Sequence, residues 1–525
     1  MDAPVVIAGA GPVGLALSCA LGHHGVASVV LEEDEALSRH SKAPGVLPRT
    51  LEVFRAWGVL DRVLAAGTLL TRPTVWSATS KQPLMTIDLA PLAEMTAVPG
   101  LLFIPQDRTE EALRDHALAL GRADLRFGHR VTGFQQGDSG VAVDVEPARG
   151  APYRIEGEIL VGCDGPHSTV REALGWRLEG KTYPTRLMLA DVSVGPELDG
   201  LPWPRVSTEG DEFGGAFRLG PDLWRILGNV AADVTDEAAV GRPAIDRRVE
   251  RLFGAPPRDV LWADVFRIHC RTSPGFRRGR VLLAGDAAHI NSPAGGQGMN
   301  SGIQDAHNLG WKIARALAGG AREPLLASYE EERRAVILTN VDRYTDLLTR
   351  AFLLAPPLLR RVTLAGARLG LSRPALSRRL LRRAAMLDTR YPRSALISGT
   401  GALVGARAED GPVRLPDGRP GRLLDLVARD AALLLFQDSS LPAWNAAEVA
   451  QIVGQVPGLR VWRLVAGDVS SGPADVADAG GLWSRWGARR GSAALVRPDG
   501  HVGWAAERPT AAALRDGVRR ALGQP

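Results

Sequence analysis

The sequence gives little support for a metal site, for disulfide bonds or for membrane-spanning helices. The chain has three cysteines in 525 residues, Cys19, Cys163 and Cys270, far apart and without a CxxC pair. We therefore expect buried, reduced thiols and no metal site. The sequence contains no HExxH or GxSxG motif, so nothing indicates a zinc protease or a serine hydrolase. No segment approaches the roughly 18 uninterrupted apolar residues that a membrane-spanning helix needs.

A large excess of one charge is also missing. The chain has 63 basic and 58 acidic residues and a formal net charge of +5, which does not demand nucleic acid as a partner. The densest basic stretch, residues 358–386, repeats leucine at helical spacing between arginine pairs. It would suit a membrane-surface or anionic-ligand helix, but we expect ordinary helices with leucines inward and arginines in solvent. An apolar strand begins almost at the N-terminus and leaves no room for a secretory signal, so we expect a cytoplasmic protein.

Glycine, in contrast, is abundant, and the first cluster is VVIAGAGPVGLAL near the N-terminus. An apolar strand is followed by a glycine turn, a helical segment and the strand SVVLE. Gly9, Gly11 and Gly14 permit a tight turn, a close approach of pyrophosphate and close helix packing. Glu32 ends the second strand at the spacing of a carboxylate that binds ribose hydroxyls. A glycine turn alone can be structural, but the whole window predicts a bound dinucleotide, NAD or FAD, because Glu32 would repel the 2′-phosphate of NADP.

A second glycine-rich stretch, LLAGDAAHINSPAGGQGMNSG at residues 282–302, lies far downstream. A short strand leads into a loop of Gly, Ser, Asn and Pro, and a helix follows from about Gly302. Asp286 after the strand can accept hydrogen bonds from polyol hydroxyls, and the glycines let backbone amides reach a flat ring. These features suit the ribityl chain and isoalloxazine of a flavin. Taken singly, Asp286 could simply cap the following turn, and a histidine such as His289 is more often packed or hydrogen-bonded than a base.

With these segments, CDGPHSTVR at 163–171 and IPQDRTEEAL at 104–113, the sequence resembles the class A flavoprotein monooxygenases of the para-hydroxybenzoate hydroxylase-like group, near the aromatic polyketide hydroxylases. The resemblance spans about residues 4 to 345. It implies an α/β fold with a doubly wound, Rossmann-like FAD-binding domain, an inserted antiparallel-sheet substrate domain and a thioredoxin-like C-terminal α/β domain.

The resemblance also implies where FAD is held. It assigns Gly9, Gly11, Gly14 and Glu32 to the ADP part, Lys42 to the phosphates, Gln106 and Asp286 to the ribityl region, Asp164 to FAD and NAD(P)H, and Pro293, Gly296, Gly298, Met299 and Asn300 to the flavin ring. Two positions depart from the family pattern, because Lys42 stands where Arg is common and Glu33 where a basic residue is frequent. Arg171 could merely neutralise Asp164. No catalytic side chain is assigned, and the backbone of the Pro293 loop is the candidate.

Four chain segments are expected to form the domains. They are residues 1–182 for the first part of the FAD-binding domain, with 75–101 contributing to the substrate domain, 183–275 for the substrate-binding sheet, 276–385 for the second FAD-binding part and helices, and 395–525 for the C-terminal domain. The alternating pattern in 183–275 predicts an antiparallel sheet. Phe213, Phe217, Trp224 and Trp203 are candidate lining residues of an apolar chamber, although such aromatics are more often core. The C-terminal domain lacks CxxC, so we expect a structural or oligomerisation role.

By the same resemblance, FAD reduced by NADPH or NADH would trap O2 as a flavin C4a-hydroperoxide and hydroxylate an aromatic, phenolic or polycyclic small molecule. The resemblance alone favours NADPH. Three alternatives stay open: Baeyer–Villiger oxygenation, another flavin oxidoreductase, and a catalytically silent FAD- or NAD-binding module. We expect no nucleic-acid or membrane partner and a monomer or homodimer.

Overall fold

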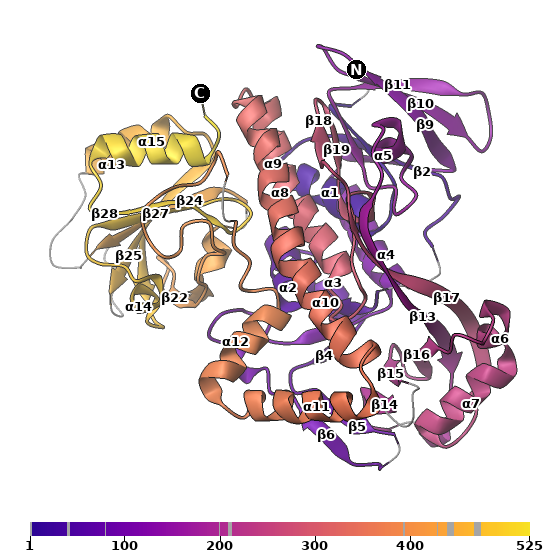
Figure 1. Cartoon of the computed structure of the whole chain (residues 1–525). Coiled ribbons are helices and arrows are strands. Elements are labelled where there is room, and N and C mark those ends of the chain that lie inside the picture. Colours follow the sequence, from indigo (N-terminus) through magenta and orange to yellow (C-terminus); the bar gives the residue numbers. More distant parts are fainter. Residues whose placement is uncertain are drawn as a thin grey trace.

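Figure 1 shows the computed structural model of the chain. It describes residues 3–38, 43–78, 80–198, 200–207, 213–391, 394–427, 429–437, 446–466 and 474–524. The three cysteines are buried and free, as predicted. No helix among the described residues is long and apolar enough to cross a membrane.

The first domain is built on a six-stranded sheet in the order β18-β19-β12-β1-β2-β8. Its parallel strands are β1 (Val5–Ala8), β2 (Ser28–Glu32), β8 (Ala123–Phe127), β12 (Ile159–Gly162) and β19 (Val281–Leu283), with β18 (Arg277–Arg278) as an antiparallel edge. Every residue of β1 is buried, as in a parallel strand that is covered on both faces. In Figure 1 helices lie on one side of this sheet and a small sheet on the other. The helices are α1 (Pro12–His23), α4 (Gln106–Ala119) and α8 (Gly298–Leu317), and the small sheet is β9 (His129–Gln136), β10 (Val141–Pro147) and β11 (Tyr153–Gly157).

An eight-stranded sheet in the order β20-β17-β13-β16-β15-β14-β5-β6 forms the second domain. Its strands are β13 (Glu179–Ser193), β14 (Arg205–Ser207), β15 (Gly214–Arg218), β16 (Leu223–Val230), β17 (Asp259–Thr272) and β20 (His289–Ile290), with β5 (Thr74–Ser77) and β6 (Pro83–Thr86) at the far edge. All pairs except β14 with β5 are antiparallel. The long strands β13 and β17 run from the first domain to the far end of the sheet (Figure 1).

Helices α6 (Asp236–Val240) and α7 (Arg242–Phe253) cover one face of this sheet. Trp224, a candidate lining residue of the substrate chamber, is 1% exposed and packs edge to face on Phe253 of α7, with ring centroids 4.8 Å apart. Trp224 is therefore not a lining residue but a core residue, the commoner outcome for such aromatics, because its side chain packs between the sheet and α7.

Several shorter elements complete the first half of the chain and connect the domains. They are β3 (Gly45–Val46), β4 (Thr68–Leu70), β7 (Leu101–Phe103), α2 (Pro48–Trp57), α3 (Leu60–Ala65), α5 (Thr169–Ala173), α9 (Arg322–Val336), α10 (Asp342–Leu348), α11 (Pro357–Leu371) and α12 (Pro374–Ala384). Strands β3, β7 and β4 form a three-stranded sheet. Helix α11 lies near the lower edge of the molecule beside the β5–β6 hairpin, which reaches below it, and α12 lies above α11 (Figure 1).

The C-terminal domain has its own mixed sheet, in the order β21-β28-β27-β24-β25-β26-β22-β23. Its strands and helices are β21 (Ser398–Gly399), β22 (Pro412–Arg414), β23 (Pro420–Arg422), β24 (Ala431–Gln437), α13 (Ala446–Gly454), β25 (Leu459–Ala466), β26 (Asp475–Asp478), α14 (Leu482–Trp486), β27 (Ser492–Val496), β28 (Val502–Glu507) and α15 (Ala511–Ala521). The β24-α13-β25 crossover followed by the β27-β28 hairpin and α15 has the thioredoxin-like order. Alternate residues of β24 enter two cores, with Leu434 on the side of α14 and Leu433 on the side of α13 and α15.

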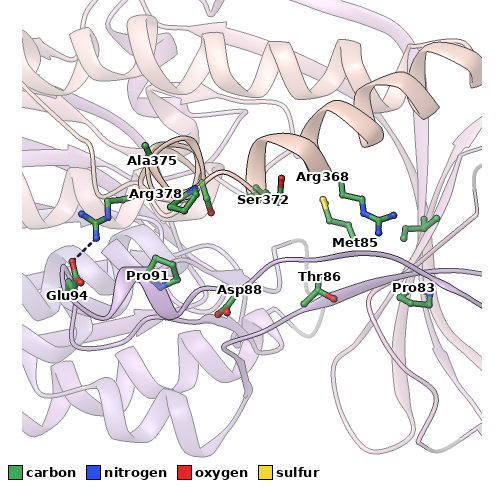
Figure 2. A pocket seen from close by; sticks show the side chains of 14 residues that line it. Pro83, Met85, Thr86, Asp88, Pro91, Glu94, Arg368, Ser372, Ala375 and Arg378 are labelled. Atoms are coloured by element: carbon green, nitrogen blue, oxygen red, sulfur yellow. Dashed lines mark hydrogen bonds and ion pairs between the residues drawn. The ribbon is translucent and has the colours of Figure 1, made fainter.

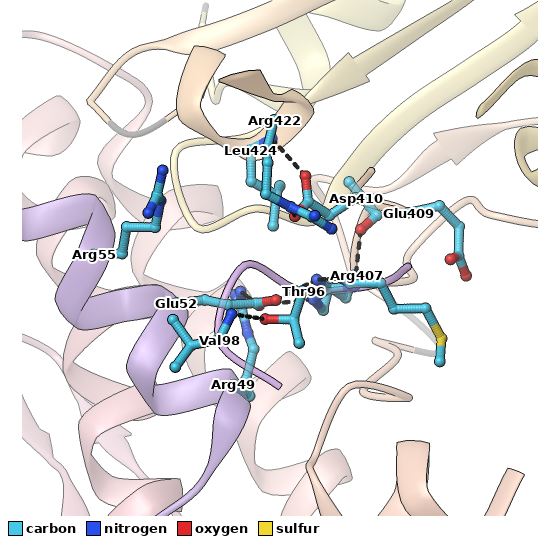
Figure 3. A network of polar contacts seen from close by, with 12 residues as sticks. Arg49, Glu52, Arg55, Thr96, Val98, Arg407, Glu409, Asp410, Arg422 and Leu424 are labelled. Carbon is cyan, nitrogen blue, oxygen red and sulfur yellow. Dashed lines mark hydrogen bonds and ion pairs between the residues drawn. The ribbon is translucent and has the colours of Figure 1, made fainter. Parts of the chain in front are cut away.

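A buried cluster of charges joins this domain to α2 (Figure 3). Glu52 accepts hydrogen bonds from Arg407 Nε at 2.8 Å and from Arg49 Nη1 at 2.9 Å. Arg49 also donates to the backbone carbonyl oxygen of Asp499 at 2.6 Å. All three charged side chains of the cluster are at most 7% exposed, and charge-assisted bonds are strong when they are screened from water. Helix α2 is thus fixed to the C-terminal domain.

A second buried cluster joins the same domain to α8 and α9. Glu332 accepts hydrogen bonds from Arg497 Nη1 at 2.6 Å and from Lys312 Nζ at 2.7 Å. Asp499 is paired with Arg497 and accepts a hydrogen bond from Asn308 Nδ2 at 2.9 Å. Removing one member would leave a buried charge uncompensated, which costs about 3–5 kcal/mol.

Helices α1 and α8 pack closely because glycine stands where they cross. A Cβ atom at Gly310 of α8 would lie 2.6 Å from Ala20 Cβ and 3.3 Å from the Ala20 carbonyl carbon. Such a contact forces a backbone to shift, since real Cβ atoms do not approach so closely.

We predict that Gly310→Ala lowers the stability of the fold by about 1–3 kcal/mol through overpacking, although alanine is the better helix former. Gly366→Ala in the exposed part of α11 is the matched control, because no described atom lies within 4 Å of its Cβ position. Thermal unfolding followed by circular dichroism should show a lower Tm for the first variant and an unchanged or higher Tm for the second. Equal melting temperatures would contradict the close packing of α1 and α8.

Candidate functional site

The residues predicted to bind FAD come together at one edge of the first sheet. Strands β1, β2, β12 and β19 are parallel neighbours, so their carboxyl ends lie side by side. Gly9 directly follows β1, Glu32 ends β2, Asp164 follows β12 and Asp286 follows β19. The chain leaves β1 toward β2 on one side, while β12 adds on the other. This is the position at which open α/β sheets bind their ligands.

The first glycine turn leaves one face open. A Cβ atom at Gly9 would lie 2.5 Å from the Cys163 carbonyl oxygen, and one at Gly14 would lie 1.9 Å from the Gly9 carbonyl oxygen. These two glycines therefore allow backbones to touch. At Gly11, by contrast, no described atom lies within 4 Å of the Cβ position. This open space at the start of α1 fits an approaching pyrophosphate, since the helix N-terminus presents free amides and a positive dipole end.

Glu32 is fixed by backbone amides at the end of β2. Its carboxylate accepts hydrogen bonds from the Ala10 N–H at 2.6 Å and the Asp34 N–H at 3.1 Å. Burial raises the pKa of this carboxyl group above its ordinary value. The side chain is half-buried and lies beside the glycine turn, where a carboxylate can accept hydrogen bonds from ribose hydroxyls.

The second glycine-rich stretch packs directly on the first. Val13, within the first turn, lies where Cβ atoms on Gly285 and Gly302 would be, with Val13 Cγ2 at 2.7 and 2.5 Å. Gly285 has φ +61°, a left-handed conformation that favours glycine. Asp286, the next residue, is exposed at the carboxyl edge. The two stretches, which are more than 270 residues apart, therefore border the same space.

The loop from Pro293 to Asn300 leads into α8 and is partly open. Pro293 and Gly296 are exposed, and no described atom lies within 4 Å of the Cβ positions of Gly296 and Gly298. Met299 is half-buried against the core of the first domain. Backbone amides on such a loop can face a flat ring without obstruction by side chains.

Asn300 differs from its neighbours because its amide group is fully used inside the protein. Its Oδ1 accepts from the Leu47 N–H at 2.9 Å, and its Nδ2 donates to the carbonyl oxygens of Gly45 at 2.9 Å and Gly296 at 2.7 Å. The side chain thus links the loop to β3. Its role is to position the loop.

Asp164 has a carboxylate oxygen that lacks a partner. Oδ2 accepts from the Val170 N–H at 3.1 Å, while Oδ1 is buried with no hydrogen bond from the described residues. Burial raises the pKa of this carboxyl group. Arg171 donates instead to the carbonyl oxygens of Ala287 at 3.3 Å and Pro166 at 3.0 Å, so it does not pair with Asp164. An orphaned buried oxygen beside the glycine turn fits a site completed by a ligand.

Gln106 begins α4 near the same edge. Its Oε1 accepts from the Ala43 N–H at 3.0 Å, and its Nε2 donates to Glu110 at 2.8 Å. Burial raises the pKa of Glu110 to about 7. Lys42 lies outside the described residues.

Sequence reasoning missed the buried ion cluster behind the second glycine stretch. Asp305 of α8 accepts hydrogen bonds from Arg333 Nε at 2.7 Å and from the Gly285 N–H at 3.1 Å, and its Oδ2 lies 2.7 Å from His289 Nε2. His289 Nδ1 lies 3.0 Å from Asn291 Oδ1. Burial alone would lower the pKa of His289, but Asp305 and Asn291 raise it above its ordinary value. His289 is therefore a packed, hydrogen-bonded residue and not an exposed base.

Three aromatic side chains meet between the first domain and the large sheet. Phe103 of β7 stacks on Phe217 of β15, with ring centroids 5.5 Å apart, and meets Trp203 edge to face at 5.4 Å. Phe213 lies apart from this group, beneath the Arg360 guanidinium at 5.9 Å. All three members of the group are half-buried, which suits the wall of an apolar chamber.

A groove of about 1100 Å³ lies between the segment after β5 and the α11–α12 pair (Figure 2). Pro83 and Met85 form part of one wall, while Arg368 and Arg378 come from the helices. Arg378 crosses the groove and pairs with Glu94 at 2.9 Å. No cluster of metal-ligating side chains exists among the described residues.

The His289–Asp305 pair predicts a pH-dependent stability. Because the pKa of folded His289 is raised, the pair stabilises the fold fully below the unfolded pKa of about 6.5, and this contribution is lost as pH rises through the folded pKa. We expect the difference in Tm between the wild type and His289→Gln to shrink as pH increases through that range. Parallel curves for the two proteins would contradict a charged His289.

Comparisons with known proteins agree with this geometry. The family described as "FAD binding domain" matches residues 2–344, and the family described as "Aromatic-ring hydroxylase, C-terminal" matches residues 401–525. The chain is 36% identical to the 12-dehydrotetracycline 5-monooxygenase/anhydrotetracycline 6-monooxygenase of Streptomyces rimosus, over 99% of both proteins. It is 31% identical to the rifampicin monooxygenase of Streptomyces venezuelae, over 96% of this chain and 95% of that protein.

Solved structures show the same architecture over the whole chain. The anhydrotetracycline hydroxylase of Streptomyces rimosus aligns with a TM-score of 0.80 at 34% identity and covers 100% of both chains. Aklavinone-11 hydroxylase, solved with FAD and aklavinone, aligns with a TM-score of 0.83 at 24% identity over 99% of both chains and shows the fold alone. The predicted fold class is confirmed. The chain belongs to the FAD-dependent aromatic-ring hydroxylase family and is an FAD-dependent monooxygenase.

Proposed function

We propose that this enzyme hydroxylates a polycyclic, phenolic small molecule of the polyketide type, with O2 and NADPH or NADH as cosubstrates. The observation that carries the proposal is the contact of the two glycine-rich stretches around Val13 at the carboxyl edge of the first sheet. The substrate class is supported by the relative named for dehydrotetracycline and anhydrotetracycline, which this chain matches along its full length. The half-buried group of Phe103, Phe217 and Trp203 offers flat apolar surface for such a ring system.

In this proposal FAD would be held by the residues at the carboxyl edge together with Lys42, which lies outside the described residues. Gly9, Gly11, Gly14 and Glu32 hold the ADP part, Lys42 the phosphates, Gln106, Asp164 and Asp286 the central region, and Pro293, Gly296, Gly298 and Met299 the ring, with Asn300 positioning that loop. FAD bound there would supply the redox chemistry between the nicotinamide and O2, with one oxygen atom entering the substrate and the other leaving as water. The chain binds and orients both partners, and its apolar walls exclude water.

The proposed domain limits follow the same assignment. Residues 1–182 and 276–385 form the FAD-binding domain and its helices, 183–275 with 75–101 the substrate domain, and 395–525 the C-terminal domain. We place the enzyme in the cytoplasm as a monomer or homodimer, to be tested by fractionation and by light scattering.

The Gly11→Ala variant tests the cofactor site without disturbing the fold. The backbone at Gly11, with φ −69°, accepts alanine, and no described atom opposes the added methyl group. We therefore expect an unchanged Tm for the FAD-free protein but a loss of FAD affinity of about ten- to hundred-fold, because the methyl group occupies the space of the pyrophosphate. The visible absorbance that remains after incubation with FAD and removal of the excess measures retention.

Gly366→Ala is again the matched control, and Asp286→Ala should also lose FAD. Full flavin content in both Gly11→Ala and Asp286→Ala would reject the site assignment.

Activity is tested by aerobic consumption of NADPH and of NADH with a panel of tetracyclic and monocyclic phenols. A phenol product that is heavier by one oxygen atom supports hydroxylation. A lactone or ester of the same mass would indicate Baeyer–Villiger chemistry. Cofactor consumption that no aromatic compound stimulates would reject the proposed substrate class.

A further inference from the structure

The outward face of α11 is unusually apolar for a surface helix. Six of the ten large apolar side chains that are exposed in the described structure lie between residues 358 and 380. Leu358 is 75% exposed, Val362 59% and Leu369 54%. The expectation that the leucines point inward is therefore wrong for these positions, whereas Arg361 and Arg368 are exposed as expected.

These side chains form a stripe along the helix. Leu358, Val362, Ala365 and Leu369 follow each other at spacings of four, three and four residues, and all are exposed. The opposite face carries Arg360, which is 4% exposed and lies over the Phe213 ring. The helix thus rests on the protein through one face and presents a continuous apolar stripe on the other.

The charges carried by α11 and α12 themselves have one sign. Between Pro357 and Ala384 the sequence has eight arginines and no aspartate or glutamate. Three of these arginines pair with carboxylates elsewhere, namely Arg378 with Glu94, Arg382 with Glu409 and Arg383 with Asp388. Four others, Arg361, Arg368, Arg373 and Arg379, are exposed, and no described carboxylate pairs with them. The formal net charge of the whole chain is only +5, so the positive excess is concentrated on this face.

The charge of this surface indicates which partner can cover the apolar stripe. A second copy that docked through the same stripe would bring two such arginine clusters together, which like-charge repulsion disfavours. An anionic bilayer supplies a continuous negative layer for the arginines and an apolar interior for the leucines. The stripe lies on a helix at the lower edge of the molecule (Figure 1), where a single helix can enter the headgroup region from the side. Arg368 also lines the groove of about 1100 Å³ beside α11 (Figure 2), which has room for a lipid headgroup.

We propose that α11 and α12 dock this enzyme reversibly on an anionic lipid surface, with Leu358, Val362 and Leu369 entering the acyl boundary and Arg361, Arg368 and Arg379 binding phosphates. This inference departs from the expectation that no membrane partner exists. It does not depend on the identity of the aromatic substrate.

The test is co-sedimentation of the full-length, FAD-loaded protein with vesicles. We expect binding to vesicles of phosphatidylcholine with about 30% phosphatidylglycerol, none to phosphatidylcholine alone, and weakening at high salt as charge is screened. The triple variant R361Q/R368Q/R379Q should bind about a hundred-fold more weakly, because each arginine near an anionic surface contributes about five-fold. The variant L358Q/V362Q/L369Q should also lose binding, although its charge is unchanged.

The matched control removes three exposed arginines elsewhere, as R149Q/R419Q/R489Q. It changes the net charge equally and should bind like the wild type. Flavin absorbance and Tm confirm that each variant is folded. A wild type that ignores phosphatidylglycerol vesicles would overturn the proposal, and so would equal losses in the control and the R361Q/R368Q/R379Q variant. A dimer that L358Q/V362Q/L369Q dissociates would also overturn it, because the stripe would then be an interface between copies.

Discussion

The carboxylate of Asp305 holds the second glycine-rich stretch against the first. It reaches from α8 to the Gly285 N–H and His289 on one side and to Arg333 of α9 on the other. Burial alone would raise its pKa, but His289 and Arg333 hold the pKa below the ordinary value. A charged group at 0% exposure persists only while each partner stays in place. The position of the Gly285 loop on Val13, and hence the closure of the cofactor site, depends on this one cluster.

The C-terminal domain also contacts the two helices, α8 and α9, that carry Asp305 and Arg333. Asp499 and Arg497 bind α8 and α9 through Asn308, Lys312 and Glu332. Helix α8 therefore carries the Pro293 loop at its start, Asp305 about two turns later, and the contacts of Asn308 and Lys312 about one and two turns beyond that. These contacts fix the helix that follows the Pro293 loop, which agrees with the structural role expected from the sequence.

The sequence predicted the carboxyl edge well because strand-turn-helix motifs are local. Gly9, Glu32 and Asp286 each follow or end a strand, and parallel strands place such residues together without further information. Asp305 and Arg333 could not be found in this way. Asp305 lies within a helical run, where an acidic residue reads as solvent-exposed, and its partners come from other elements. The sequence could not decide between chamber and core for Trp224 for a related reason, since alternation along β16 identifies two faces but does not say which face α7 covers.

For helix α11 the sequence predicted an amphipathic helix correctly, but it did not show that the apolar face points outward. The leucine spacing predicts an amphipathic helix, and an apolar face normally points toward a core. In this helix the inward positions include Arg360 and Gly370, while the apolar stripe faces outward. Only the composition around it gives a clue, because a solvated helix balances its charges, whereas residues 357–384 hold eight arginines and no carboxylate, and carboxylates of other segments pair with only three of them. An oppositely charged surface with an apolar interior would match both the exposed apolar stripe and the arginines that no described carboxylate pairs with.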